Sequence, residues 1–370
     1  MRKLDITMSY PTQVKCAESE TVIYSHSQTC KIKYSELFTP KAIFDAYLRA
    51  RKTKRKKGYI FNFELSLMAN LEDLRLSLVN HTYKPIPCRV FNIWCNAGHK
   101  IRVINAPDFR DLIAQFVFYD AVYSYFDKGY IFDSYGCRKG KGALKAANRT
   151  QEFIRQSPKD SYYLQIDIRK YYYSIDHKIL KQSLQRRIQD QDLVNLAMQF
   201  CENDSNVGIN VGSLVAQLFG QIYLDRFDHY VKRVLKIKHY VRYVDDMVFI
   251  GLSYEDAKSL LATVQQYLHK NLHLTLSKWL IRPLSKGINF AGLRTWHSHR
   301  FIRKRSLHTF SKRLKSKDYQ ALESVLAHAQ YSSSYKHLMT RLQTESTYSQ
   351  LPKHLQRRLD KWQFTHTLQK

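Results

Sequence analysis

Two adjacent aspartates inside a strand-forming run constrain this chain more than any other feature. The run is YVRYVDDMVFI, residues 240–250, and most of its residues are β-branched or aromatic. Neighbouring carboxylates in such a run lose hydration and repel each other unless a cation neutralises them. We therefore predict that one strand turns into the next at Asp245-Asp246 and aims both carboxylates at one point. The alternative is an ordinary β-turn with Asp as the turn former.

A third carboxylate ends another apolar segment. YYLQIDI, residues 162–168, predicts a buried strand that carries Asp167. If this strand lies beside the Asp245-Asp246 hairpin, three carboxylates gather at one edge of a sheet. Mg²⁺ prefers oxygen ligands and needs few protein carboxylates where phosphates and water complete its shell. We predict Asp167, Asp245 and Asp246 as catalytic metal ligands for two ions that activate a 3′ hydroxyl and stabilise a leaving pyrophosphate, with Mg²⁺ expected and Mn²⁺ as an alternative.

The charge of the chain indicates a polyanionic partner. It has 60 Lys+Arg against 31 Asp+Glu, a formal net charge of +29, and 13% aromatic residues. Cations that meet phosphates and rings that meet bases suit a nucleic-acid groove. The alternative is a protein that its charge merely keeps soluble.

Length and cysteine usage place further bounds. The 370 residues suffice for two or three subdomains around a substantial core. The six cysteines form no pair at zinc-ligand spacing, which favours free thiols. No segment reaches the length and hydropathy of a membrane span. We therefore expect a cytoplasmic protein with no membrane partner.

Hydrophobic periodicity predicts a mixed chain. Helices are expected from residue 40 and over 63–80, 108–127, 143–157, 177–189, 191–202, 213–236 and 254–271. A β-hairpin is expected within 83–106, and residues 134–142 (SYGCRKGKG) form a glycine-rich basic loop. Residues 293–370 contain no glycine, and their pattern predicts a separate basic helical module. Residues 1–40 show no clear pattern.

Several motifs resemble those of reverse transcriptases, the palm-domain RNA-directed DNA polymerases. YVDD at 243–246 resembles their catalytic box, and DIRKYYYSIDH at 167–177 resembles their first aspartate motif in its bacterial form. KIR at 100–102 and the basic loop at 134–142 resemble fingers motifs. SKW at 277–279 and GINFAG at 287–292 resemble a further palm motif and the primer grip. The resemblance covers about residues 41–310.

This resemblance implies an α+β right-hand polymerase with an antiparallel palm sheet and a helical thumb. The implied divisions are an N-terminal extension at 1–40, fingers at 41–160, a palm at 161–292 and a basic thumb at 293–370. The implied substrates and partners are dNTPs, an RNA template and a DNA product, with an accessory protein or a homo-oligomer as further options.

The resemblance also assigns roles to individual residues. Tyr172 would be a steric gate that crowds a ribose 2′-OH, and its alternative is a core aromatic in a run of three tyrosines. Arg102 is the strongest single candidate for triphosphate binding, because an Arg fork suits phosphate oxygens. The nucleotide-binding set is Lys100, Arg102, Tyr172, Gln217 and Lys278. The template- and primer-binding set is Arg138, Lys141, Val211, Gly212, Phe290 and Gly292.

Two neighbouring groups of reverse transcriptases fit the sequence. The basic loop and residues 208–223 resemble the enzymes of diversity-generating retroelements, which carry mutations into a target gene. Departures from that pattern stand at Asn210, at Ala216-Gln217 and at Gly220-Gln221, where template base and nucleotide should stack, and Leu112 replaces a usual arginine. They favour the defence-associated enzymes, which make cDNA from a noncoding RNA against phage. Alternatives are a catalytically inactive RNA-binding scaffold and an RNA-templated RNA polymerase, which Tyr172 disfavours.

Overall fold

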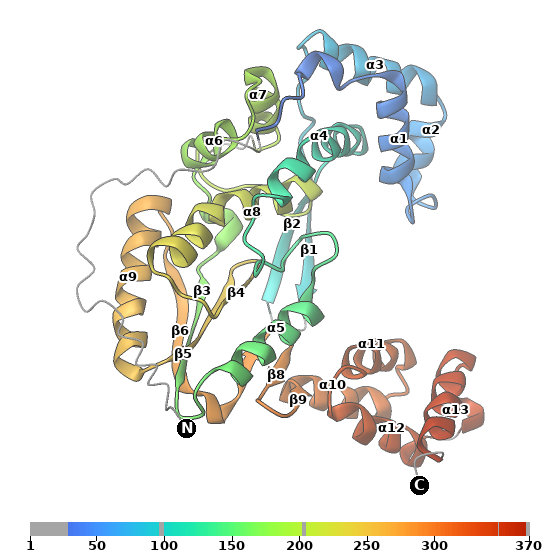
Figure 1. Ribbon diagram of the computed structural model, residues 1–370. Coiled ribbons are helices and arrows are strands. Elements are labelled where there is room, and N and C mark those ends of the chain that lie inside the picture. Colours follow the sequence, from blue (N-terminus) through green and yellow to red (C-terminus); the bar gives the residue numbers. More distant parts are fainter. Residues whose placement is uncertain (1–28, 96–99, 202–204, 347, 368–370) are drawn as a thin grey trace.

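A four-stranded antiparallel sheet forms the centre of the protein, which we describe from a computed structural model (Figure 1). The structure describes residues 29–95, 100–201, 205–346 and 348–367. The strands are β3 (Tyr162–Ile168), β4 (Tyr240–Tyr243), β5 (Asp246–Leu252) and β6 (Leu276–Pro283), in the order β4-β5-β3-β6. β3 and β5, which carry the predicted aspartates, are therefore the two inner strands.

Alternation along β3 separates two faces of this sheet. Leu164, Ile166 and Ile168 point into the main core, which also contains residues of α8 (Leu214–His229) and α9 (Tyr254–Leu272). Tyr163 points to the opposite face and packs in a smaller core with Phe153 of α5 (Ala143–Gln156). Gln165 and Asp167 share the face of Tyr163 but are only partly buried. The strand thus leaves its polar end accessible on one face.

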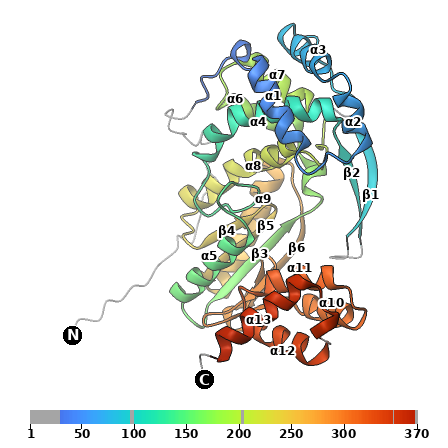
Figure 2. The same ribbon diagram turned by 90° about the vertical axis from the view of Figure 1, so that its right-hand side faces the viewer.

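A group of helices lies at the top of Figure 1, and a two-stranded hairpin extends from it down beside the sheet (Figures 1 and 2). They are α1 (Pro40–Arg51), α2 (Gly58–Glu64), α3 (Leu67–Val79), β1 (Arg89–Cys95), β2 (Lys100–Ala106) and α4 (Phe109–Asp127). α1 packs on α4, and α4 packs on α8. Two short helices, α6 (His177–Gln185) and α7 (Gln191–Gln199), follow β3 and the 3₁₀ turn at Tyr171–Ser174.

The C-terminal part has a core of its own. It consists of β7 (Ile288–Phe290), β8 (Leu293–Thr295), β9 (Arg300–Ile302), α10 (Lys304–Lys315), α11 (Tyr319–Ala329), α12 (Ser334–Glu345) and α13 (Lys353–Thr367). Phe310, Leu326 and Leu338 are fully buried in this second core. Both ribbon views show its helices grouped beside the lower end of the sheet (Figures 1 and 2).

Most of the expected elements are confirmed, and three expectations are wrong in detail. The helix expected over 63–80 is two helices, since the helical conformation is interrupted between Glu64 and Leu67. The helix expected over 213–236 ends at His229 and continues as a π-helical turn, Tyr230–Val234. The helical module expected from residue 293 begins with β8 and β9, whose backbone pairs with β7. Across the described residues, no helix is both long and apolar enough to cross a membrane.

Candidate active site

The predicted aspartate pair lies at the tightest turn of the central sheet. Tyr243 pairs with Asp246, so Val244 and Asp245 are the two turn residues between β4 and β5. Val244 has a φ of 59°, a left-handed conformation that is costly for a β-branched residue. Surrounding contacts must therefore hold this turn in place.

The third aspartate stands directly opposite the pair. Asp167 of β3 is the register partner of Asp246 on β5, and on its other side it is the register partner of Lys278 on β6. Gln165 donates a hydrogen bond to Asp246 Oδ1 at 2.8 Å, and the Ser277 hydroxyl donates to Asp167 Oδ2. The sequence prediction that these carboxylates approach one another at the end of β3 is confirmed by this register.

Burial and the nearby charge of Asp167 disfavour the ionised forms of Asp245 and Asp246. Burial and then the negative charge of Asp167 together raise the pKa of Asp245 to about 6, although the positive charges of Arg102 and Arg242 lower it. Burial raises the pKa of Asp246 to about 7, although the hydrogen bond from Gln165 opposes this shift. A bound cation would remove the cost of keeping both groups ionised.

The site is incomplete as a metal site made of protein alone. Within the part of the chain that the structure describes, no group of three His, Cys, Asp or Glu side chains is arranged to hold a metal ion. Carboxylate oxygens suit Mg²⁺, which needs only one or two of them where phosphates and water complete the shell. The donor set therefore fits a cation that arrives with a phosphate-bearing substrate.

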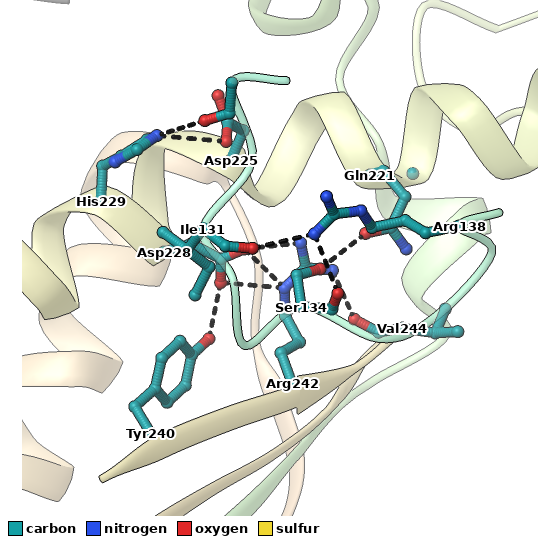
Figure 3. A network of polar contacts seen from close by, with 12 residues as sticks. Ile131, Ser134, Arg138, Gln221, Asp225, Asp228, His229, Tyr240, Arg242 and Val244 are labelled. Carbon is teal, nitrogen blue, oxygen red and sulfur yellow. Dashed lines mark hydrogen bonds and ion pairs between the residues drawn. The ribbon is translucent and has the colours of Figure 1, made fainter. Parts of the chain in front are cut away.

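A buried ion pair anchors the strained turn from behind (Figure 3). Arg242 of β4 and Asp228 of α8 have fully buried side chains, and Arg242 Nη2 lies 2.6 Å from Asp228 Oδ2. The Tyr240 hydroxyl donates to Asp228 Oδ1 at 2.7 Å. A second guanidinium nitrogen of Arg242, Nη1, donates to the carbonyl of Val244 at 2.9 Å. Arg242 thus links a helix of the core to the turn that carries Asp245.

A sequence profile of the reverse transcriptase (RNA-dependent DNA polymerase) family matches residues 96–294, more than half of the 370-residue chain. The chain belongs to the reverse transcriptase family. It is therefore an RNA-directed DNA polymerase, which is a nucleotidyltransferase. The matched range includes all three aspartates.

Curated relatives of this reverse transcriptase are distant. Protein YkfC of Escherichia coli (strain K12) is 23% identical over 288 residues, which cover 65% of this chain and 73% of that protein. A putative COX1/OXI3 intron 2 protein of Saccharomyces cerevisiae is 20% identical over 317 residues, which cover 65% of this chain and 36% of that protein. The chain thus spans only about a third of the yeast protein.

Two similar solved structures are telomerases. The telomerase of Candida albicans, in complex with a fragment of telomeric RNA, has a TM-score of 0.46 at 12% identity, and the match covers 72% of this chain and 57% of that chain. The apo telomerase of Candida tropicalis has a TM-score of 0.42 at 12% identity, with 64% of this chain and 60% of that chain covered.

The steric-gate candidate lies beside the catalytic turn of this reverse transcriptase. Burial raises the pKa of Tyr172, and the charge of Asp245 and a hydrogen bond with Cys137 contribute to the shift. Gly220 of α8 makes room for the ring, since a Cβ there would lie 2.9 Å from Tyr172 Cε1. The Tyr171 hydroxyl donates to the Gly220 carbonyl. Tyr172 is thus a partly buried ring, held from two sides, near Asp245.

Cations predicted for the nucleotide lie on two sides of the aspartates. Arg102 of β2 is exposed and lies close enough to lower the pKa of Asp245. Lys278 is exposed on β6 beside Asp167. Lys100 begins β2, and its side chain lies outside the described part. Gln217 is exposed on α8, and its role stays a prediction.

A groove of about 440 Å³ continues from the aspartates along β6. Asp167 and Asp246 line one end of it, and it is otherwise lined by Lys278, Trp279, Arg282, Arg294 and Arg303, among others. The Trp279 side chain is 55% exposed. Cations along the floor and an exposed ring suit a nucleic-acid strand.

Two residues predicted to contact template or primer instead hold the basic loop together. The Arg138 guanidinium is 7% exposed and pairs with Asp127 at 2.7 Å, and its other nitrogens donate to the carbonyls of Ile131, Ser134 and Asp127. Lys141 donates to the Phe132 carbonyl at 2.8 Å and lies over the Phe132 ring. Four of the five N–H donors of this buried guanidinium are already used, which disfavours a direct contact of Arg138 with phosphate, and the assignment of Lys141 stays a prediction.

Of the two primer-grip residues, Phe290 needs correction, and the role of Gly292 stays a prediction. Phe290 is 1% exposed and packs in the smaller core, so its ring cannot contact a strand. Gly292 has a φ of 88°, and a Cβ there would lie 2.9 Å from the His328 ring of α11. Gly292 therefore allows close packing of the C-terminal helices against β7 and β8.

The loop before α8 packs against the hairpin of β1 and β2. The backbone N–H of Asn105 donates to the Val211 carbonyl at 3.1 Å, and a Cβ at Gly212 would lie 3.1 Å from the backbone carbonyl oxygen of Asn105. The Asn105 side chain also donates to Asn210 Oδ1 at 2.8 Å. Val211, Gly212 and Asn210 thus lie at the base of the hairpin that carries Arg102.

Gln221, one of the departures from the family pattern, does not reach a nucleotide. It is 1% exposed, and its Oε1 accepts a hydrogen bond from the Ser134 hydroxyl (Figure 3). The expectation that this position stacks with the nascent base pair is wrong, because Gln221 faces the basic loop across the palm core.

Sequence reasoning missed the residues that support the aspartates. Gln165 stands two residues before Asp167 and so shares its face of β3, a signal that the strand period already contains. Arg242, two residues before the turn, is a charge inside an apolar strand and carries a similar signal. Its partner Asp228 lies on a helix 14 residues earlier, and no local pattern links the two.

Proposed function

We propose that this reverse transcriptase makes cDNA from a bound noncoding RNA by two-metal nucleotidyl transfer, in defence against phage. The observation that carries the chemistry is the pairing of Asp167 with Asp246 on the two inner strands, with Asp245 in the adjoining turn. The elevated pKa values of Asp245 and Asp246 support a site in which bound cations neutralise the carboxylates.

The three aspartates would hold the metal ions. Bound Mg²⁺ would supply Lewis acidity at the primer 3′ hydroxyl and at the triphosphate. Gln165 and Ser277 orient the carboxylates, since each donates a hydrogen bond to one of them. Arg102 and Lys278 would neutralise triphosphate oxygens on either side, and Tyr172 would limit the space at the sugar.

Primer extension on an RNA template with dNTPs and Mg²⁺ tests this chemistry. We expect D246N and D167N each to lower the rate about 10²- to 10³-fold, since loss of a charge-stabilising group at a transition state commonly costs that much. D160N, which neutralises an exposed aspartate in the loop before β3, is the matched control and should keep the wild-type rate. Wild-type rates for D246N would reject the assignment and favour the inactive RNA-binding scaffold.

The biological role requires a different measurement. The sequence departure at Asn210 favours the defence-associated group, while the basic loop at 134–142 also suits a diversity-generating retroelement. Sequencing of RNA and cDNA that copurify with the enzyme separates the two. Repetitive or non-genomic cDNA supports defence, and adenine-targeted mutations of a variable repeat support the retroelement instead.

A further inference from the structure

A pocket of about 580 Å³ lies on the face of the β1–β2 hairpin that is opposite to Arg102. Val90 and Asn105 are register partners in this hairpin, and both line the pocket. Arg102 stands three positions before Asn105 on β2, so its side chain points to the other face of the strand. Among the described residues, the pocket shares no lining residue with the groove that runs from the aspartates along β6.

The lining of this pocket is neutral, although the chain has a formal net charge of +29. No Lys or Arg lines it among the described residues. Its one acidic residue, Asp111, already accepts hydrogen bonds from the Tyr83 hydroxyl at 2.9 Å and from the Ile86 backbone N–H at 2.6 Å. Much of the apolar wall consists of flat or rigid groups, namely Pro85, Pro87, Pro107 and Phe200. Such a lining suits an uncharged, flat group better than a phosphate.

Gln115 of α4 brings an unsatisfied amide to this pocket. The residue is 5% exposed and lines the pocket, and its Oε1 has no hydrogen-bond partner among the described residues. A buried acceptor without a donor costs about 1–3 kcal/mol, so its presence requires an explanation. By contrast, Asn105 and Asn210 satisfy each other, since Asn105 Nδ2 donates to Asn210 Oδ1 at 2.8 Å. Gln115 is therefore the amide that an N–H group of a ligand would complete.

We propose that this pocket holds an adenine base. A glutamine amide pairs with adenine through two hydrogen bonds, because its oxygen accepts from the exocyclic amino group while its nitrogen donates to a ring nitrogen. Phe200 and the prolines supply apolar surface against which the ring can pack. The base can belong to an unpaired position of a bound RNA or to a free nucleoside, since both present the same ring.

A base held in this pocket would make RNA binding depend on sequence, because splayed-out bases are read on their hydrogen-bonding edges. Uracil has no exocyclic amino group, so it cannot form the same two bonds. This selectivity goes beyond the polymerase reaction and does not depend on catalysis at the aspartates.

Fluorescence anisotropy with labelled 12-nucleotide RNAs tests the pocket. Oligoadenylate and oligouridylate are titrated separately in EDTA and 0.15 M salt without primer or dNTPs, so polymerase activity cannot contribute. We expect wild type to bind oligoadenylate more tightly. We expect Q115L to reduce the ratio of the two dissociation constants about tenfold, which corresponds to about 1.4 kcal/mol. Q265L makes the same substitution at an exposed position of α9 and should keep the wild-type ratio.

Two features keep this test independent of folding. Leucine is similar in size to glutamine and removes the unsatisfied acceptor, so Q115L should fold as well as wild type. Q199W changes a partly exposed residue that lines the pocket, and its large ring should also lower the ratio by filling the space for the base. An unchanged ratio in Q115L overturns the proposal. So does an equal fall in Q265L, because the preference would then not arise at this pocket.

Saturation-transfer NMR with free adenosine assigns the source of the base. A signal that wild type gives and Q115L lacks supports a pocket that takes the free nucleoside. No signal in wild type, with the preference for oligoadenylate intact, supports a pocket that takes a base only within an RNA strand.

Discussion

Arg242 donates hydrogen bonds to both carboxylate oxygens of Asp228 in a fully buried ion pair, and its remaining nitrogen, Nη1, donates to the carbonyl of Val244. The pair therefore does two things. It satisfies two charges inside the core, and it fixes the strained turn that presents Asp245. These two roles can be separated by experiment, because one of them concerns stability and the other concerns geometry.

The R242M variant should leave Asp228 as an uncompensated buried charge. We expect a loss of about 3–5 kcal/mol in the free energy of unfolding, measured by urea denaturation. R242M/D228N should recover part of this loss, since the neutral amide still accepts from Tyr240. The double variant should nevertheless extend primers more slowly than wild type at equal folded fraction, because Val244 has lost its donor. If wild-type kcat returned with stability, Arg242 would have no positioning role.

Gly136 should tolerate no side chain, because the catalytic turn lies against it. A Cβ there would lie 2.5 Å from the backbone nitrogen of Val244, and backbone cannot move aside as a flexible side chain can. We expect G136A to cost about 1–3 kcal/mol of stability, as overpacking does, and to lower kcat in primer extension. G58A is the matched control, since a Cβ at Gly58 meets no atom within 4 Å. Equal kinetics in both variants would show that the turn adjusts without cost.

Tyr172 should control the choice of sugar. Y172A opens space beside Asp245, and we expect the preference for dNTPs over NTPs, measured as a ratio of kcat/KM, to fall at least about tenfold. Y172F keeps the ring but loses the hydroxyl that contacts Cys137, so it should retain most of the preference. Similar discrimination in Y172A and wild type would make Tyr172 a core aromatic only.

The sequence predicted those parts of the site that depend on local pattern. Strand period and the repulsion between Asp245 and Asp246 correctly indicated a turn and a partner strand ending on Asp167. The sequence could not predict long-range packing. Arg138 forms an ion pair with Asp127, and Phe290 lies in a core whose residues come together only in the folded chain. Charge and motif position indicated nucleic-acid contact for both residues, and neither signal reports burial.

A buried histidine should make stability depend on pH. His239 lies next to the Ser157 hydroxyl and stacks on Phe153 at 4.7 Å between ring centres. Burial lowers its pKa from the ordinary value of 6.5, and the positive charges of Lys232 and Arg149 lower it further. The folded state therefore binds this proton less readily than the unfolded state. The stability that His239 contributes is fully present above pH 6.5 and is lost as the pH falls below it.

The H239Q variant isolates this effect from the carboxylates that titrate in the same range. We expect the free energy of unfolding of wild type minus that of H239Q to fall as the pH is lowered from 7.5 to 5.5. Groups common to both proteins, such as Asp225 with its raised pKa, cancel in the difference. H269Q replaces an exposed histidine of α9 and serves as the control in parallel urea titrations. A pH-independent difference for H239Q would mean that His239 accepts its proton as easily in the folded protein as in the unfolded chain.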